Sequence, residues 1–213
     1  MLSRGKFIVL EGLDGSGKTT QLQLLHERMQ QHCKQRKCFA TREPSESFPG
    51  LLCRGISRRS IQVENETIAM LFAADRYEHV VGELLPQLEQ GNHILCDRYY
   101  FSNFAYQMLS TDLESLLAYN KKAMDLLHPD VTIYVDVSPE ECAARRSTSR
   151  TSEELYEKVD TAKKIYRNYM TAFDALQQSE RVVTINGNRD AQTVADSIWK
   201  FLTEQVFDKD DLI

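Results

Sequence analysis

A short apolar segment followed by a glycine-rich turn constrains the fold of this chain more than any other feature. Residues 7–10 are four apolar residues in a row, which predicts a strand buried on both faces. Residues 12–19 then match the pattern G-x-x-x-x-G-K-[ST]. Apolar residues between 22 and 29 recur at roughly helical spacing. A strand, this turn and a helix in that order predict a phosphate-binding loop.

The residue types in the turn explain how it would bind phosphate. Gly12, Gly15 and Gly17 let the backbone adopt positive φ and approach a ligand closely. Successive N–H groups then form an anion-binding nest at a helix N-terminus. Lys18 would place a charge on the β- and γ-phosphates, and Thr19 would offer its hydroxyl to Mg²⁺. A chance glycine-rich turn is disfavoured by this strand–helix frame, but the motif leaves the reaction open.

The rest of the chain alternates between predicted strands and helices, which is typical of an α/β fold. Further strands are expected at 38–41, 93–97, 131–137 and 182–185. Helices are expected at 18–35, 51–57, 64–88, 113–127, 139–146, 153–176 and 194–206. We therefore expect a five-stranded parallel sheet between helices, in a single domain over 1–213. The acidic tail at 208–211 is expected to be frayed.

The composition of the chain limits the classes of molecule that it is expected to bind. The chain has 213 residues, of which 42% are hydrophobic, enough for a sizeable core. A formal net charge of −5 argues against a general nucleic-acid binder. Five cysteines without C-x-x-C spacing and no visible signal peptide predict reduced thiols and a cytoplasmic location. No apolar run approaches the roughly 20 residues that span a bilayer, so no membrane association is expected.

Several polar residues are expected near the carboxyl ends of the strands, where ligands bind in open parallel sheets. Arg42 follows the second strand, which makes an anion contact plausible. Asp97 ends an apolar strand and would help to hold Mg²⁺. Phe72 and Arg76 share one helical face, where a core aromatic and a salt-bridging arginine are the ordinary interpretation. The aromatic and polar stretch at 100–107 is more typical of a ligand wall than of a plain core helix.

Taken together, these motifs resemble the thymidylate kinases of the P-loop nucleoside monophosphate kinase group. The resemblance covers nearly the whole chain and rests on residues 11–21 (EGLDGSGKTTQ), 41–44 (TREP), 71–76 (LFAADR), 97–99 (DRY), 102–107 (SNFAYQ) and 136–140 (DVSPE). It implies a P-loop NTPase fold, a homodimer, and the reaction of ATP with dTMP to give ADP and dTDP in the presence of Mg²⁺. One departure is that residues 45–47 are Ser-Glu-Ser, where the family often has a Gly-Gly pair.

The resemblance also implies residue roles. Mg²⁺ would be held by Thr19 and Asp97. ATP would be bound by the loop residues Gly12, Leu13, Asp14, Gly15, Ser16, Gly17, Lys18, Thr19 and Thr20, and by Asn188 and Arg189 in the turn that contacts adenine. The side chains that would bind dTMP are Asp14 at the 3′-hydroxyl, Phe72 and Arg76 at thymine, Asn103 at the base edge, Tyr106 against a 2′-hydroxyl, and Arg42 and Arg98 at the phosphate.

The arginine that acts on the transferred phosphoryl group is a separate question. Some family members carry it directly after the loop aspartate, but this chain has Gly15 there. The alternative is a lid, which we expect at about 145–155 because this segment is short, basic and rich in hydroxyl groups. We favour Arg150, with Arg146 second, alongside Lys18, Asp97 and Arg98 in the catalytic set. The ordinary alternative for this segment is a solvated loop.

A chain with this loop could have three other functions. A kinase of another small acceptor, such as a deoxynucleoside, would share the same loop, and an acceptor panel would separate the two. A GTPase switch would need an N-K-x-D guanine motif, and residues 120–123 (Asn-Lys-Lys-Ala) lack the aspartate. A catalytically inactive scaffold is disfavoured because neither the loop nor Asp97 is disrupted.

Overall fold

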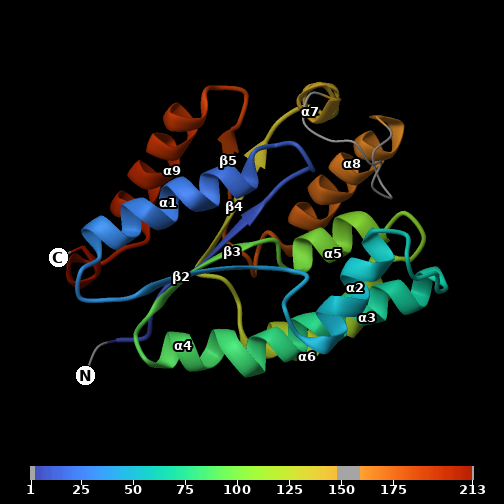
Figure 1. Cartoon of the computed structure of the whole chain (residues 1–213), viewed down its shortest axis with the longest axis horizontal. Helices are drawn as coiled ribbons and strands as arrows, with labels where there is room; N and C mark the ends of the chain where they lie inside the picture. Colours follow the sequence, from blue (N-terminus) through green and yellow to red (C-terminus); the bar gives the residue numbers. More distant parts are fainter. Residues whose placement is uncertain (1–2, 148–158, 213) are drawn as a thin grey trace.

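A parallel sheet forms the centre of the protein in the computed structural model, which describes residues 3–147 and 159–212 (Figure 1). Its strands are β1 (Phe7–Glu11), β2 (Cys38–Arg42), β3 (His93–Asp97), β4 (Val131–Asp136) and β5 (Val182–Asn186). The spatial order is β2-β3-β1-β4-β5, and every neighbouring pair is parallel. The predicted five-stranded parallel sheet of an α/β protein is therefore confirmed.

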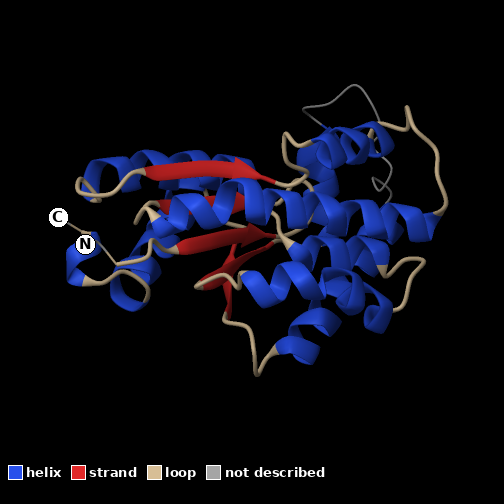
Figure 2. Ribbon diagram, turned by 90° about the horizontal axis from the view of Figure 1, so that it is seen from below, coloured by secondary structure: helices blue, strands red, loops and turns tan. Residues whose placement is uncertain are grey.

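Helices connect the strands and cover both faces of the sheet (Figure 2). They are α1 (Lys18–His32), α2 (Phe48–Ser57), α3 (Asn65–His79), α4 (Leu85–Glu89), α5 (Tyr100–Gln107), α6 (Leu113–Leu126), α7 (Pro139–Ser147), α8 (Val159–Leu176) and α9 (Ala191–Gln205). The helix expected over 64–88 is interrupted by a π-helical turn at Val80–Leu84, between α3 and α4. The first residues of the helix expected from 153 lie outside the described residues.

The pleat of β1 divides the core into two clusters, because successive side chains point to opposite faces of the sheet. Ile8 and Leu10 pack in one cluster with apolar residues of α1 and α9. Phe7 and Val9 pack in the other, with residues of α3 to α6 and of α8. β1 is therefore buried on both faces, as its run of apolar residues predicts.

The parallel register brings three chain segments to one edge of the sheet. Leu10 of β1 pairs with Asp97 of β3, and Arg42 of β2 pairs with the same residue. The glycine-rich loop after β1, the turn after β2 and the segment after β3 consequently meet at the carboxyl edge. Ligands bind at this edge in open parallel sheets.

The C-terminal segment differs from the frayed tail expected from its sequence. Lys209–Asp211 forms a 3₁₀ turn, and the side chain of Asp211 is buried. Its carboxylate lies 2.9 Å from Nε of Arg36, which is also buried. The prediction was wrong because an acidic run appears solvated until its distant cationic partner is known.

Among the described residues, no helix is both long and apolar enough to cross a bilayer.

Candidate active site

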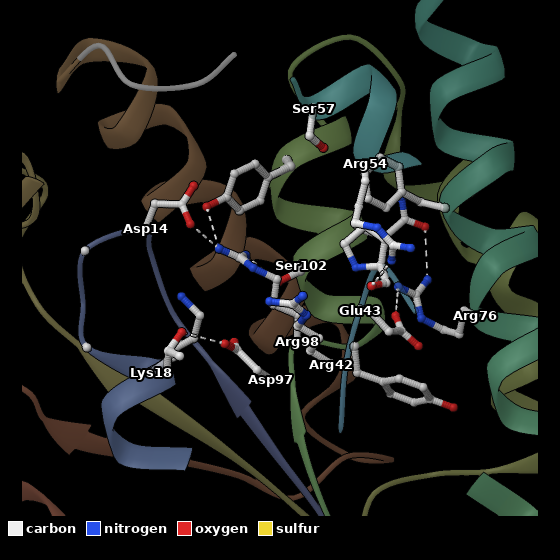
Figure 3. Close-up of a pocket in the computed structure, with 18 of the residues that line it drawn as sticks. Asp14, Lys18, Arg42, Glu43, Arg54, Ser57, Arg76, Asp97, Arg98 and Ser102 are labelled. Carbon is white, nitrogen blue, oxygen red and sulfur yellow. Dashed lines mark hydrogen bonds and ion pairs between the residues drawn. The ribbon is translucent and has the colours of Figure 1, made fainter. Parts of the chain in front are cut away.

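A pocket of about 510 Å³ lies at the carboxyl edge of the sheet (Figure 3). Small-molecule sites commonly have volumes of about 300–1,000 Å³. Most of the site residues predicted from the sequence line it: Asp14, Gly15, Gly17, Lys18, Thr19, Thr20, Arg42, Phe72, Arg76, Asp97, Arg98, Asn103, Tyr106 and Arg146. Figure 3 shows Asp14, Lys18 and Asp97 on one side of Arg98, and Glu43 and Arg76 on the other.

Other predicted residues lie elsewhere. Gly12, Leu13 and Ser16 belong to the same loop but do not line the pocket. Asn188 and Arg189 are exposed on the turn after β5 and do not line it either. Arg150, and with it most of the predicted lid over 145–155, lies outside the described residues.

The helix α7 reaches the turn after β5 through Arg145. Its Nη2 donates a hydrogen bond to the carbonyl oxygen of Gly187 at 3.1 Å, and its Nε donates to Glu141 at 2.9 Å. Arg145 and the adjacent Arg146 both line the pocket. The start of the predicted lid therefore lies at the rim of the pocket, beside the turn that carries Asn188.

The glycine-rich loop lies close against neighbouring backbone carbonyl groups, and it can do so only because two of its positions have no side chain. Gly12 has φ of 148°, and a Cβ there would lie 2.8 Å from the carbonyl oxygen of Val135. Gly15 has φ of 91°, and its Cβ would lie 2.6 Å from the carbonyl oxygen of Cys142. Any other residue would be strained at both positions. The loop leads directly into α1, whose first residue is Lys18.

Lys18 holds the loop from within. Its Nζ donates hydrogen bonds to the carbonyl oxygens of Gly12 and Leu13, each at 2.9 Å. Burial lowers the pKa of Lys18, and the nearby charge of Arg98 lowers it further. The loop thus presents a buried amine beside backbone N–H groups at a helix N-terminus, which together can bind an anion.

Thr19 and Asp97 form the predicted metal-binding pair. Thr19 Oγ1, in the first turn of α1, donates to Oδ2 of Asp97, the last residue of β3, at 3.1 Å. Asp97 Oδ1 is buried and has no hydrogen-bond partner among the described residues. Mg²⁺ prefers carboxylate, hydroxyl and water oxygens. A buried carboxylate oxygen with unused acceptor capacity at a phosphate-binding loop therefore fits a magnesium site.

Arg98 lies at the middle of the pocket and is restrained on several sides. It has φ of 75°, and its guanidinium donates to Asp14 Oδ1 and, at 3.3 Å, to the Tyr106 hydroxyl. The same guanidinium lies 5.0 Å from the Tyr106 ring centroid, a cation–π contact. Burial raises the pKa of Asp14, but the charges of Arg98 and Lys18 more than offset it and lower that pKa to about 2.

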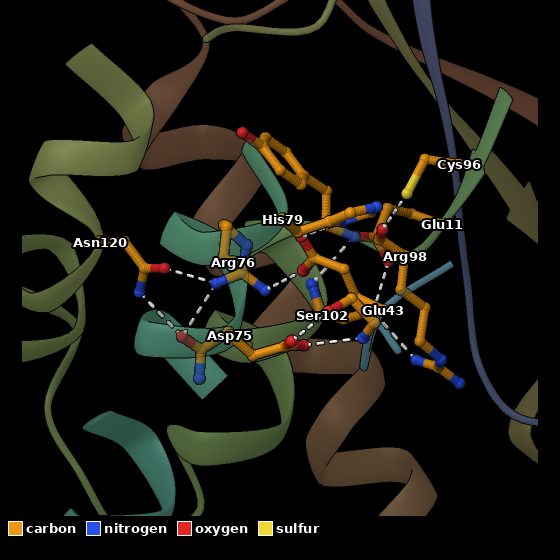
Figure 4. A network of polar contacts seen from close by, with 12 residues as sticks. Glu11, Glu43, Asp75, Arg76, His79, Cys96, Arg98, Ser102 and Asn120 are labelled. Atoms are coloured by element: carbon orange, nitrogen blue, oxygen red, sulfur yellow. Dashed lines mark hydrogen bonds and ion pairs between the residues drawn. The ribbon is translucent and has the colours of Figure 1, made fainter. Parts of the chain in front are cut away.

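A buried carboxylate that the sequence analysis did not single out, Glu11, is linked to Arg98 through Ser102 (Figure 4). Glu11 accepts hydrogen bonds from the backbone N–H groups of Tyr99 and Ser102, at 2.8 and 3.0 Å. The Ser102 hydroxyl donates to Glu11 at 2.6 Å and accepts from Arg98 at 2.9 Å. Burial raises the pKa of Glu11 above its ordinary value. The only sign of this role in the sequence is the position of Glu11 directly before the glycine-rich loop.

The opposite end of the pocket combines an aromatic ring, a buried arginine and amides. Phe72 and Arg76 of α3 both line it, as their shared helical face predicts. Arg76 Nη2 donates to Glu43 at 2.5 Å, and Nη1 donates to Asn103 Oδ1 at 3.2 Å. Burial disfavours the charged form of Arg76, but Glu43 more than compensates and raises its pKa. A permanently charged donor therefore lies beside a neutral amide.

The turn after β2 is held by a buried carboxylate. Asp75 accepts hydrogen bonds from the backbone N–H of Ser45 at 2.9 Å, from the Ser45 hydroxyl at 2.5 Å and from the Ser47 hydroxyl at 2.8 Å. The two serines thus have a defined role at the place where the chain departs from the family's glycine pair. Arg42, whose side chain is 66% exposed, lines the pocket from the start of this turn.

The segment at 100–107 forms the helix α5 and part of the pocket wall. Every residue of α5 is buried. Tyr100, Phe101 and Phe104 pack in the hydrophobic core, whereas Asn103 and Gln107 line the pocket. Further lining residues that the sequence analysis did not assign are Glu43, Pro44, Arg54, Ser57, Arg58, Tyr99, Ser102, Gln107 and Arg145. Most of them are next to predicted residues in the chain, and only this proximity could have identified them from the sequence.

Comparison with known proteins agrees with this geometry. A family model described as thymidylate kinase matches residues 10–198. The chain is 34% identical to a thymidylate kinase of Exiguobacterium sp. over 208 residues, which covers 95% of this chain and 96% of that protein. It is 39% identical to a probable thymidylate kinase of Pyrococcus horikoshii (78% and 82% covered) and to a thymidylate kinase of Plasmodium falciparum (78% and 76% covered). The chain belongs to the thymidylate kinase family.

Proposed function

We propose that this protein transfers the γ-phosphoryl group of ATP to dTMP, giving ADP and dTDP for dTTP synthesis. The carrying observation is a single pocket that joins a phosphate-binding loop to an end formed by Phe72, Arg76 and Asn103. Arg98 lies between the two ends, where an acceptor phosphate and a donor phosphate would meet. Membership of the thymidylate kinase family supports the same reaction.

The acceptor would be bound along the length of the pocket. Phe72 stacks on thymine, and Arg76 donates to its O4 oxygen beside the base edge read by Asn103. Tyr106 lies against the position of a 2′-hydroxyl, which favours deoxyribose, and Asp14 accepts from the 3′-hydroxyl. Arg42 and Arg98 bind the monophosphate from both sides. These roles are supported by the positions of all seven side chains in the pocket lining.

The donor would be bound by the loop, with Gly12, Leu13, Asp14, Gly15, Ser16, Gly17, Lys18, Thr19 and Thr20 around the phosphates, and with Asn188 and Arg189 near adenine. Thr19 and Asp97 would hold Mg²⁺, which neutralises phosphate charge when bound. Lys18 and Arg98 add fixed positive charge where negative charge develops on the transferred group. In-line placement and charge neutralisation supply most of the catalysis in phosphoryl transfer.

The lid arginines and the assembly complete the proposal. Arg146, which lines the pocket, and Arg150 are the candidates that act on the transferred phosphoryl group from the lid. We also infer a homodimer, from the family, and a cytoplasmic location, from the cysteine pattern of the sequence. Light scattering on the purified protein measures the dimer directly, and a monomeric mass would contradict it.

An acceptor panel tests the reaction. ADP release is measured with Mg-ATP and, separately, dTMP, dUMP, dCMP, AMP and thymidine. We expect the highest kcat/KM with dTMP, weaker turnover of dUMP, and strong rejection of dCMP. Highest turnover of thymidine would indicate a nucleoside kinase instead. No transfer to any acceptor, despite tight ATP binding, would rule out the proposed reaction.

A further inference from the structure

Asn120 is a buried amide directly behind the end of the pocket that carries Arg76 and Asn103. It lies on α6, its exposed fraction is 0%, and it is not one of the residues that line the pocket. Arg76 Nη1 donates a hydrogen bond to Asn120 Oδ1, and Asn120 Nδ2 donates to Asn103 Oδ1 at 2.8 Å. Figure 4 shows the Asn120 side chain facing the Arg76 guanidinium.

The orientation of the Asn120 amide is determined by two neighbours of fixed polarity. The Arg76 guanidinium can only donate hydrogen bonds, so it must face the amide oxygen. The backbone carbonyl of Leu116 can only accept, and Asn120 Nδ2 donates to it at 2.8 Å. Reversing the amide would place donor against donor and acceptor against acceptor. Unmatched groups of this kind are costly in a buried site.

The orientation of the Asn120 amide also determines which atoms of the pocket wall donate and which accept hydrogen bonds. Because Asn120 presents its N–H to Asn103, the Asn103 side chain must present its oxygen in return. Asn103 Nδ2 is thereby directed to Gln107, whose Oε1 accepts from it at 2.9 Å. Asn103 and Gln107 both line the pocket, and both are almost completely buried. Arg76 Nη1 also donates to Asn103 Oδ1, at 3.2 Å, so the donor and acceptor pattern of this wall depends on Asn120 and Arg76 together.

We propose that Asn120 is a positioning residue for base specificity, which together with Arg76 holds Asn103 and Gln107 of the pocket wall in one hydrogen-bond polarity. This inference rests on the proposed function, in which that wall faces the base of the acceptor nucleotide. A wall held in one polarity favours a pyrimidine with a 4-oxo group and rejects one with a 4-amino group. Polar mismatches of this kind give far larger discrimination than a single methyl group does.

The substitution Asn120→Asp tests the proposal with almost no change in volume. A second carboxylate oxygen would face the Leu116 carbonyl and the Asn103 oxygen. The stronger of the two hydrogen bonds that orient Asn103 would be lost, and turning the Asn103 N–H toward the carboxylate would cost only the longer bond from Arg76 Nη1. The kcat/KM ratio of dTMP to dCMP should then fall at least about tenfold. The ratio of dTMP to dUMP should stay within about twofold, because the methyl group that separates these two bases is not read by hydrogen bonds.

Asn168→Asp is the matched control. Asn168 lies on α8, and its Nδ2 also donates to a helix carbonyl, that of Ala105 at 2.9 Å. Ala105 belongs to α5, the helix that carries Asn103. The control therefore introduces the same acceptor–acceptor conflict on the same helix, away from the wall. We expect its dTMP to dCMP ratio to equal that of the wild type, whatever its effect on Tm.

A second variant and a second measurement keep the proposal testable if Asn120→Asp does not fold or has no turnover. Asn120→Leu removes both hydrogen bonds to the wall without adding charge, and it should lower the dTMP to dCMP ratio several-fold. Where turnover is lost, calorimetry gives the ratio of the Kd values of the two nucleotides, which should shift in the same direction. An unchanged ratio in whichever variant folds overturns the role of Asn120. Failure of the wild type to use dTMP would instead contradict the proposed function.

Discussion

The Arg98 guanidinium donates a hydrogen bond to the Ser102 hydroxyl at 2.9 Å, and that hydroxyl donates onward to the buried Glu11 carboxylate at 2.6 Å. Asp14 and Tyr106 hold the guanidinium on its other side. Arg98 is thus held in one orientation by its own protein contacts. A cation oriented in advance loses little conformational entropy when it binds a phosphate.

Ser102→Ala should reduce kcat by roughly ten- to a hundredfold, because it removes the link between Arg98 and Glu11 and a small misplacement is costly in transfer reactions. Steady-state ADP release with dTMP measures the change. Ser197→Ala is the matched control, since its hydroxyl donates to a carbonyl on α9, outside the pocket. A Ser102→Ala enzyme with the kcat of the wild type would contradict an orienting role for this hydrogen bond.

Asp97→Asn should raise the Mg²⁺ concentration needed for half-maximal activity by at least about tenfold, because an amide is a weaker ligand than a carboxylate for a hard cation. The buried Oδ1 of Asp97, which has no protein donor among the described residues, is the oxygen in question. Titrating Mg²⁺ at saturating ATP and dTMP gives the shift. An unchanged Mg²⁺ midpoint would exclude Asp97 from the metal site.

Arg146→Ala and Arg150→Ala test the lid. Whichever arginine acts on the transferred phosphoryl group should lower kcat by about 10³-fold or more when removed. Arg145→Ala is the comparison, because Arg145 bonds Glu141 and Gly187 and should mainly affect the KM for ATP. Near-normal kcat in both the Arg146 and Arg150 variants would show that this lid supplies no such arginine.

Asp14 should contribute to stability in a pH-dependent way. Burial raises its pKa, but the charges of Arg98 and Lys18 outweigh that effect and lower it from an ordinary 3.8 to about 2. A folded-state pKa below the unfolded value stabilises the protein at pH values above the unfolded pKa. That contribution is lost as the pH falls through the folded pKa.

Urea unfolding of the wild type and of Asp14→Asn from pH 5 downward measures this contribution. The difference in unfolding free energy between the two proteins should decrease by on the order of 2 kcal/mol between pH 5 and pH 2. A difference that stays constant over this interval would show that Asp14 is not ion-paired in the folded protein.

Arg36→Met should destabilise the fold without impairing catalysis. It removes the nearest cation from the buried Asp211 carboxylate and leaves, among the described residues, only Lys6 Nζ at 4.0 Å and His93 Nε2 at 3.7 Å. Removing one partner of a buried ion pair costs up to about 3–5 kcal/mol. Neither Arg36 nor Asp211 lines the pocket, so kcat measured at a temperature well below Tm should be unchanged. Asp210→Asn, at an exposed neighbouring position, should leave Tm nearly unaltered. An equal Tm for Arg36→Met and the wild type would mean that the tail contributes little.

The fold and the phosphate end of the pocket could be predicted because their signals are local. Residues 7–10 are apolar on both faces of one strand, and the glycines beside them mark positions of positive φ. Asp97 could be recognised because it ends an apolar strand, and parallel register then brings it to Thr19. Each of these inferences needs only a few consecutive residues and the geometry of a parallel sheet.

The support of the site could not be predicted in the same way. Glu11, Asp75 and Asn120 do not stand out in the sequence, yet each is buried. Glu11 and Asn120 accept hydrogen bonds from the pocket residues Ser102 and Arg76, and Asp75 accepts from Ser45 in the turn after β2. The tail at 208–211 was expected to be frayed, because the sequence gives no sign that Asp211 lies beside Arg36. A polar residue has the same appearance in a sequence whether it meets water or a partner.

The sequence by itself determined the strand order along the chain, the phosphate-binding loop and the residue types available to a nucleotide. These depend on backbone conformation and on periodic burial, which short segments encode. Only the tertiary structure decided which polar side chains meet. The packing of α3, α5 and α6 brings Arg76, Asn103 and Asn120 into one buried network, in which each amide must match the polarity of its neighbours.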